Sequence, residues 1–411
     1  MLLRQTFTEL LKNKSRSFLT VLGVTIGIAV VIVVLSAGNG VKGLILGELA
    51  SFGDDWIQIE PKIPSTDHLS GDNSNAQARG AAVTTLTLED MEQIKQIDGI
   101  KNAYGAVTSQ AVVSYENEKK QPTIFGVTAS YQDIDKGKLL KGRFFDYDEE
   151  IGAAEVIVFG YDIANTLFGS DDPIGKSVSV NGKRYRVIGV MEERGSAAFF
   201  DYDSIVYIPV TTVQKKIAGI DHILFATAQM YRGENGYALA EEIRSVLREQ
   251  HVITDPDKDD FAVTTQEESV ELINGVFFGI SVLLVVLAGI SLIVGGVGIM
   301  NVMYVSVVER TFEIGLRKSI GARNADIQKQ FLLEAVVLTL LGGLLGISIG
   351  VVVSFVISVV AQFLGFNWDF VISIPSIILA VGFSLSVGIG FGYFPAKRAA
   401  MLDPIEALRA E

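Results

Sequence analysis

One stretch of the sequence has residue types that could bind phosphate. Residues 169–177 read Gly-Ser-Asp-Asp-Pro-Ile-Gly-Lys-Ser, close to the glycine-rich loop that holds nucleotide phosphates. The stretch has one residue too many between its glycines, and it places Asp171 and Asp172 where phosphates would sit. We therefore interpret it as a β-turn. Since the rest of the chain shows no nucleotide motif and no catalytic constellation, we expect no catalytic residue and no ATPase activity of its own.

Other reactive groups are scarce. The chain has no cysteine and three histidines, which excludes disulfides, zinc–thiolate sites and thiol nucleophiles. We expect no metal site and no cofactor in this chain. The net charge of −13 is uneven, because residues 41–270 hold 22 Lys and Arg against 37 Asp and Glu, while the rest holds 12 against 10. An acidic block argues against binding nucleic acid, and ordinary solubility explains it equally well.

A charged segment, residues 308–323, separates two long apolar runs. It reads Val-Glu-Arg-Thr-Phe-Glu-Ile-Gly-Leu-Arg-Lys-Ser-Ile-Gly-Ala-Arg. In a helix, Phe312, Leu316 and Ile320 fall at i, i+4 and i+8 and form one apolar stripe. A loop that only sets membrane topology would explain the charges. It would not explain the stripe, so the pattern favours a surface that a partner covers.

Local signals define the ends of this hinge helix and one ion pair on it. Glu313 and Arg317 are spaced i, i+4 in the favourable order. Gly321 stands where a C′ glycine would end the helix. Asn324 and Asp326 could cap the start of the next helix. The sequence therefore predicts a short amphipathic helix between two membrane spans.

Four apolar runs are long enough to cross a bilayer, whose core needs about 20 residues. They are Ser17–Val41, Leu272–Val308, Ala335–Trp368 and Phe370–Ala396. Leu272–Val308 has 37 residues without a charge, or about 55 Å as one helix. We expect this helix to project beyond the membrane as a stalk. The first run could also be a signal peptide, but it exceeds the usual apolar length, so we favour an uncleaved anchor.

The basic residues predict the topology. Outside residues 41–270 they lie at the N-terminus, in the hinge and at the C-terminus: Arg4, Lys12, Lys14, Arg16, Arg310, Arg317, Lys318, Arg323, Lys329, Lys397, Arg398 and Arg409. Positive residues stay inside, so these three segments are cytoplasmic and residues 42–270 are outside.

Residues 42–270 alternate strand and helix signals. The predicted strands include Trp56–Glu60, Val107–Tyr115, Thr123–Val127, Ser177–Val180, Arg184–Met191 and Phe261–Thr265, and the predicted helices include 87–97, capped by Thr87 and Asp90, and Gly236–Gln250. Asn181-Gly182 indicates a type I′ hairpin. Pro61–Thr85 shows no periodicity and is interpreted as a loop. This mixture predicts an α+β domain.

Small residues repeat within the spans. Gly342, Gly346 and Gly350 follow one another at i, i+4 and i+8, which allows close helix approach within the bundle or at a dimer seam. The spans Leu272–Val308 and Ala335–Val360 contain no Asp, Glu, Lys, Arg or His. Ion-coupled transporters usually keep such groups at membrane depth, so energy is expected to come from elsewhere.

Phrases in three regions resemble the MacB-like and FtsX-like transporter permeases. They are the hinge, the outer-domain phrases Gly-Arg-Phe-Phe at 142–145 and Arg-Val-Ile-Gly-Val at 186–190, and the C-terminal Pro-Ala-Lys-Arg-Ala-Ala and Pro-Ile-Glu-Ala-Leu-Arg. In that family the hinge is the coupling helix that docks on an ATP-hydrolysing subunit. The resemblance implies this role for Glu309, Arg310, Phe312, Glu313, Ile314, Gly315, Leu316, Arg317, Ile320, Gly321 and Ala322.

The resemblance and the pattern together predict the fold class: a four-helix membrane protein with a large extracytoplasmic α+β domain inserted between helices 1 and 2. The expected segments are an interfacial helix 1–16, spans at 17–41, 271–308, 330–361 and 371–396, a coupling helix 309–323, and a cytoplasmic tail 397–411. The outer domain, 42–270, would divide into a porter-like part, 42–130 with 215–270, and a sabre-like part, 131–214.

The resemblance also implies the function and partners. We expect a permease subunit of an ABC-type efflux transporter in a prokaryotic cell membrane. It would form a homodimer, surrounded by membrane lipid, with two copies of a separate ATPase that holds ATP and magnesium, and it could engage an adaptor protein. Two alternatives stay open, namely an FtsX-like regulator of cell-wall hydrolases and a permease that extracts lipoproteins. Neither the substrate nor the adaptor follows from the sequence.

Overall fold

The computed structural model describes residues 14–51, 55–64, 83–197, 200–364, 366 and 368–409. Most of the expected interfacial helix 1–16 and most of the expected loop 61–85 therefore lie outside the described residues. The chain divides into two compact units. The helical unit comprises the chain up to Gly43 and from Asn274 onward, and the sheet unit comprises Leu44–Ile273. Each unit is considered separately below.

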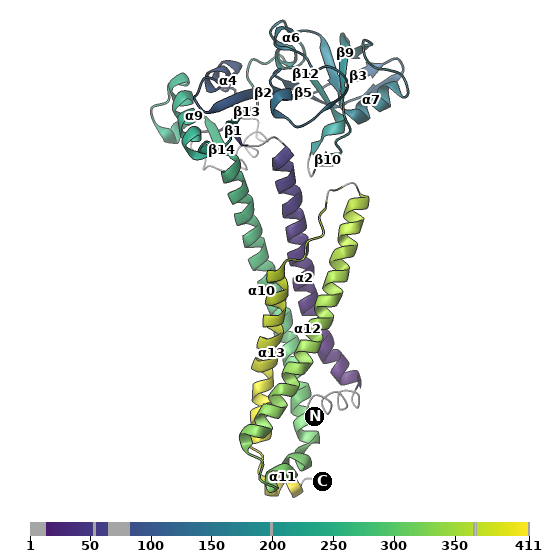
Figure 1. Cartoon of the computed structure of the whole chain (residues 1–411), viewed down its shortest axis with the longest axis vertical. Coiled ribbons are helices and arrows are strands. Elements are labelled where there is room, and N and C mark those ends of the chain that lie inside the picture. Colours follow the sequence, from purple (N-terminus) through teal and green to yellow (C-terminus); the bar gives the residue numbers. More distant parts are fainter. Residues whose placement is uncertain are drawn as a thin grey trace. The chain divides into compact units, whose positions relative to one another are not determined.

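The described residues of the helical unit form four long helices and two short ones (Figure 1). The long helices are α2 (Lys14–Ser51), α10 (Gln266–Glu309), α12 (Asn324–Phe363) and α13 (Ile374–Ala400), and the short ones are α11 (Thr311–Ser319) and α14 (Pro404–Arg409). Each long helix contains a segment long and apolar enough to cross a membrane. The expected helix of unusual length is confirmed, since α10 is one helix of 44 residues, or about 66 Å.

Glycines bring the long helices close together. A Cβ on Gly346 would lie 2.7 Å from the carbonyl oxygen of Thr25, and one on Gly350 would lie 3.0 Å from that of Ala29. Gly342 likewise faces Val21 and Val24. The three glycines at i, i+4 and i+8 therefore lie where α12 packs on the backbone of α2.

The sheet unit contains a sheet of twelve strands among its described residues. The order along the sheet is β14-β1-β13-β2-β5-β12-β7-β9-β8-β3-β4, and β6 also pairs with β9. The strands are β1 (Trp56–Pro61), β2 (Ile100–Gln110), β3 (Val113–Tyr115), β4 (Glu118–Lys120), β5 (Thr123–Val127), β6 (Leu139–Gly142), β7 (Val156–Phe159), β8 (Ser177–Val180), β9 (Lys183–Met191), β12 (Ile205–Pro209), β13 (Phe225–Met230) and β14 (Phe261–Thr265). Two short strands, β10 (Ser196–Ala197) and β11 (Phe200–Asp201), pair separately. The expected α+β domain is confirmed.

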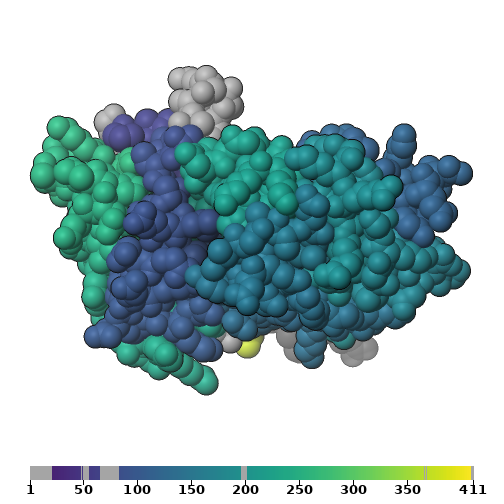
Figure 2. Space-filling model, turned by 90° about the horizontal axis from the view of Figure 1, so that it is seen from above, coloured from purple at the N-terminus to yellow at the C-terminus, as the bar shows by residue number. Residues whose placement is uncertain are grey.

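Helices cover this sheet, and their bounds are α4 (Leu88–Ile94), α5 (Tyr131–Ile134), α6 (Tyr147–Ile151), α7 (Tyr161–Phe168), α8 (Val210–Thr212) and α9 (Gly236–Gln250), with short η1 (Tyr202–Ser204), η2 (Val213–Ala218) and η3 (Pro256–Lys258). Figure 2 shows this unit from above. Residues near 250, in green, and residues near 100, in dark blue, lie together at one end. This agrees with the strand order, which places β14, β1, β13 and β2 side by side.

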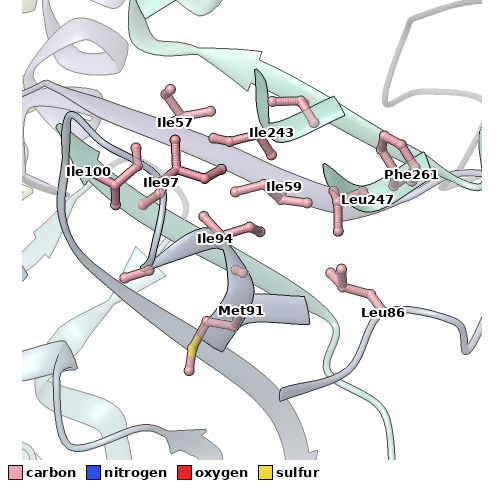
Figure 3. Close-up of a cluster of buried hydrophobic side chains, with 14 of the residues drawn as sticks. Ile57, Ile59, Leu86, Met91, Ile94, Ile97, Ile100, Ile243, Leu247 and Phe261 are labelled. Atoms are coloured by element: carbon pink, nitrogen blue, oxygen red, sulfur yellow. The ribbon is translucent and has the colours of Figure 1, made fainter. Parts of the chain in front are cut away.

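One half of the sheet unit has a core between its strands and two helices. In β1 the alternate residues Ile57 and Ile59 are fully buried, and they pack with Ile94 of α4 and Ile243 of α9 (Figure 3). The start of α4 is capped as predicted: Asp90 Oδ2 accepts from the Thr87 backbone N–H at 2.7 Å. The sequence pattern agrees with the burial here. The apolar residues recur every second position in the strand and about every fourth position in the helices, and both sets face the same core.

The other half holds the hairpin predicted at Asn181-Gly182. Both residues have positive φ, 48° and 85°, as a type I′ turn requires, and they join β8 to β9. The expected single strand Val107–Tyr115 is wrong, because the chain leaves the ladder after Gln110 and β3 pairs with β8 instead. Val113 is buried against residues of this second half. Residues 113–120 thus pack with the segment expected to begin at 131.

Candidate docking surface

The hinge helix α11 is defined at its C-terminal end by a glycine motif. Gly321 has φ +102°, and its N–H donates to Lys318 O at 3.1 Å, while the Ala322 N–H donates to Arg317 O at 3.1 Å. This is the two-bond pattern that ends helices at a C′ glycine, so that prediction is confirmed. The predicted cap by Asn324 is wrong, because Arg323 holds the N-cap position of α12 and its N–H donates to Asp326 Oδ2.

The apolar stripe on α11 faces away from the protein. Phe312, Leu316 and Ile320 are 56, 49 and 81% exposed. The helix lies outside the candidate spans, between the one that ends at Glu309 and the one that begins at Asn324. Exposed apolar patches of this kind mark interaction sites.

The opposite side of α11 is buried. Ile314 packs with Ile327 and with alanines at the end of α13, and Gly315 is also buried. Ala322 is partly buried beside the same cluster. The structure therefore separates the residues predicted for docking: Phe312, Leu316 and Ile320 point outward, whereas Ile314, Gly315 and Ala322 hold the helix in place.

Ion pairs fix α11 against α12. The predicted pair is present, with Arg317 Nη2 2.5 Å from Glu313 Oε1. Arg310 Nε lies 3.0 Å from Glu313 Oε2, and Arg310 Nη1 lies 3.1 Å from Glu334 Oε2. Burial alone would raise the pKa of Glu313, but the hydrogen bond from Arg310 and the charges of Arg310 and Arg317 lower it below its ordinary value.

Two sets of contacts that hold the hinge helix could not be predicted from the sequence, those of Glu334 and those of Lys318. Glu334 lies 24 residues from Arg310, and its carboxylate is almost buried. Lys318 Nζ donates to Ala400 O at 2.9 Å and to Leu402 O at 2.6 Å. Neither partner lies at a helical spacing from the hinge, so no local pattern could indicate it. Glu309 is the last residue of α10.

The stretch that approaches a phosphate-binding motif forms the predicted turn. The Lys176 N–H donates to Pro173 O at 3.1 Å, and Gly175 has φ +81°. The ammonium group of Lys176 lies 2.7 Å from Asp171 Oδ2. Among the described residues, no group of three or more His, Cys, Asp or Glu could hold a metal ion.

In the described part of the chain, four helices could cross a membrane, and a mixed sheet unit lies between the first and the second in sequence, as in a multi-pass membrane protein. Comparisons with known proteins agree. The family model of the MacB-like periplasmic core domain matches residues 17–246, and that of the FtsX-like permease C-terminal matches residues 285–404. The chain belongs to this family and is a multi-pass inner-membrane protein with a large extracytoplasmic domain.

Curated relatives match throughout the chain. A macrolide export ATP-binding/permease protein MacB of Bdellovibrio bacteriovorus is 36% identical over 411 residues, covering 100% of this chain and 61% of the relative. Its namesake in Chlorobium luteolum is 37% identical, covering 99% of this chain and 60% of the relative. The chain thus spans about 60% of the length of these relatives. The solved periplasmic region of MacB from Actinobacillus actinomycetemcomitans is 22% identical, with TM-score 0.47, over 56% of this chain and 97% of that one.

Proposed function

We propose that this chain is the permease subunit of an ABC-type efflux transporter, and that α11 docks on a separate ATP-hydrolysing subunit. The exposed stripe of Phe312, Leu316 and Ile320 carries this proposal. It is apolar, it lies outside the spans, and ion pairs and a buried face hold its helix rigidly. A rigid apolar ridge suits a groove in a protein partner.

The chemistry in this proposal belongs to the partner. Two copies of the ATPase hold ATP and magnesium and serve a homodimer of this chain. The curated relatives are named ATP-binding/permease proteins, and about 60% of their length matches this chain, which supports an ATP-binding part that works with the permease.

The permease would transmit movement. ATP binding closes the two ATPases and displaces α11, which follows α10 in the chain. Because α10 is one continuous helix whose first residues belong to the sheet unit, it can carry a displacement along its length. Substrate, such as a drug or peptide, would then be driven outward on the extracytoplasmic side, with an adaptor protein receiving it. The absence of Asp, Glu, Lys, Arg and His from Leu272–Val308 supports an external source of energy.

Leu316→Asp tests the docking step. Burying a Leu side chain is worth about 1.5–3 kcal/mol, and each 1.4 kcal/mol is about tenfold in affinity, so we expect docking to weaken at least tenfold. The chain and an ABC ATPase subunit from the same organism would be co-expressed, and their affinity measured after purification. Ile151→Asp, at an exposed apolar position on α6, is the matched control. Full affinity in Leu316→Asp would show that the hinge is only a topogenic loop.

A further inference from the structure

The C-terminal helix α14 packs directly on the hinge helix. Ala407 of α14 is buried, and its Cβ lies only 2.8 Å from where a Cβ on Gly315 would stand. Only glycine at 315 allows this approach without displacing one of the two helices. Figure 1 shows α11 and the yellow C-terminal helix together at one end of the helical unit. The two helices therefore form one surface element, here called the docking block (α11 with α14).

Lys318 joins the docking block to α13. Its ammonium group donates to the carbonyl oxygens of Ala400, the last residue of α13, and Leu402, in the link to α14. The last carbonyls of a helix have no partner within the helix, and a lysine satisfies them well. The ammonium group thus holds the start of α14 beside α11, so that a load on either helix reaches the other.

Helix α14 also exposes apolar side chains. Ile405 is 67% exposed and Leu408 is 39% exposed. The fourth candidate span ends at Ala400, so these residues lie beyond it, as the α11 stripe lies beyond the second.

The stripe on α11 is too small to form a stable interface alone. Three apolar side chains are far fewer than the roughly 20–30 residues that each partner contributes to a stable interface of about 800 Å² a side. The adjoining apolar surface of α14 supplies further area. The Gly315–Ala407 contact on the inner face of α11 holds α14 beside it, so one partner can cover both helices.

We propose that α14 is a second docking element, and that the ATP-hydrolysing subunit contacts α11 and α14 together. This inference rests on the proposed function, since it gives α14 the partner assigned to α11. It accounts for the glycine at 315 and the alanine at 407, whose close contact keeps the two apolar surfaces adjacent.

Single cysteines test this directly, because the chain has none of its own. Leu316→Cys, Ile405→Cys and the control Ile151→Cys would be made in the full chain and purified with and without the ABC ATPase subunit used in the docking experiment. The rate of alkylation by N-ethylmaleimide is then measured. At about ten times the Kd about nine-tenths of the chain is bound, so the rates at 316 and 405 should fall about tenfold, while that at 151 should not change.

The outcomes separate the two proposals. Protection at 316 without protection at 405 would show that α14 is not contacted, and the docking role of α11 would stand. If neither position is protected in a mixture of the two correctly folded proteins, the proposed function is overturned, and this inference with it. Protection at 405 alone would contradict a joint surface.

Discussion

Helices α9 and α11 carry the same apolar spacing and use it in opposite ways. In α9, Leu239, Ile243 and Leu247 stand at i, i+4 and i+8 and are buried in the sheet unit. In α11, Phe312, Leu316 and Ile320 have that spacing and are exposed. A repeat of four therefore identifies an apolar face without telling what covers it.

The neighbours of each helix decide the difference. The inner face of α9 meets β1 and β14 of its own sheet (Figure 3), and its outer face is charged. The inner face of α11 is already occupied, because Ile314 packs on the end of α13 and Gly315 meets α14. The remaining apolar face of α11 is surplus to the fold of this chain, which is why we assign it to a partner.

Truncating one residue of each stripe gives the largest contrast. Ile243→Ala should destabilise the sheet unit by about 2–5 kcal/mol, because Ile243 is fully buried and its loss leaves a cavity. Leu316→Ala should change the stability of the chain by less than about 0.5 kcal/mol. Thermal unfolding can be followed by far-UV circular dichroism, which reports on both units, and for the sheet unit also by the fluorescence of Trp56, which is buried in β1. Equal losses in the two variants would remove the distinction between a covered and a free stripe.

The same contrast can be drawn within the spans. Gly346→Ala places a methyl group 2.7 Å from the backbone oxygen of Thr25, whereas at Gly390 nothing lies within 4 Å. Overpacking of this kind costs about 1–3 kcal/mol, so Gly346→Ala should lower the melting temperature of the detergent-solubilised chain and Gly390→Ala should not. If Gly390→Ala is the more harmful, the close packing of α12 on α2 is not what stabilises the bundle.

Much of the fold could be predicted because its signals are local. Residues only a few positions apart determine where several elements begin and end, namely α9, β5, β8 and β14. The same is true of the capping box at Thr87 and the turn at Asn181-Gly182. The four long apolar helices depend only on composition and length. The residues that cause each of these features therefore lie within one short stretch of sequence.

The contacts that escaped prediction join distant parts of the chain. β3 pairs with β8, where Val113 meets Val180, and the sequence near 113 reads equally well as a continuation of β2. Lys318 binds carbonyls some 80 residues away. The stripe on α11 was visible in the sequence, but its exposure depends on Ile314 and Gly315 being buried, which only the packed structure reveals.

The smallest expected effect lies at the edge of the α11 surface, in the Glu313→Gln variant. The pKa of Glu313 is below its ordinary value of 4.5, so the folded state favours the charged carboxylate. This stabilisation is present above the unfolded pKa and is lost as the pH falls through the folded pKa. Because the side chain is partly exposed and solvent screens the pair, its contribution is below about 1 kcal/mol.

Glu313→Gln should therefore melt slightly below the unmodified chain at neutral pH, and the two melting temperatures should converge as the solution is acidified past the folded pKa. Added salt should narrow the neutral-pH difference, because exposed charges are screened. Docking of the ATPase should stay nearly intact, since the apolar stripe is unchanged, while ATP turnover stimulated by the permease should fall if the pair orients α11. A loss of docking as large as that of Leu316→Asp would mean that charge, and not the apolar stripe, holds the partner.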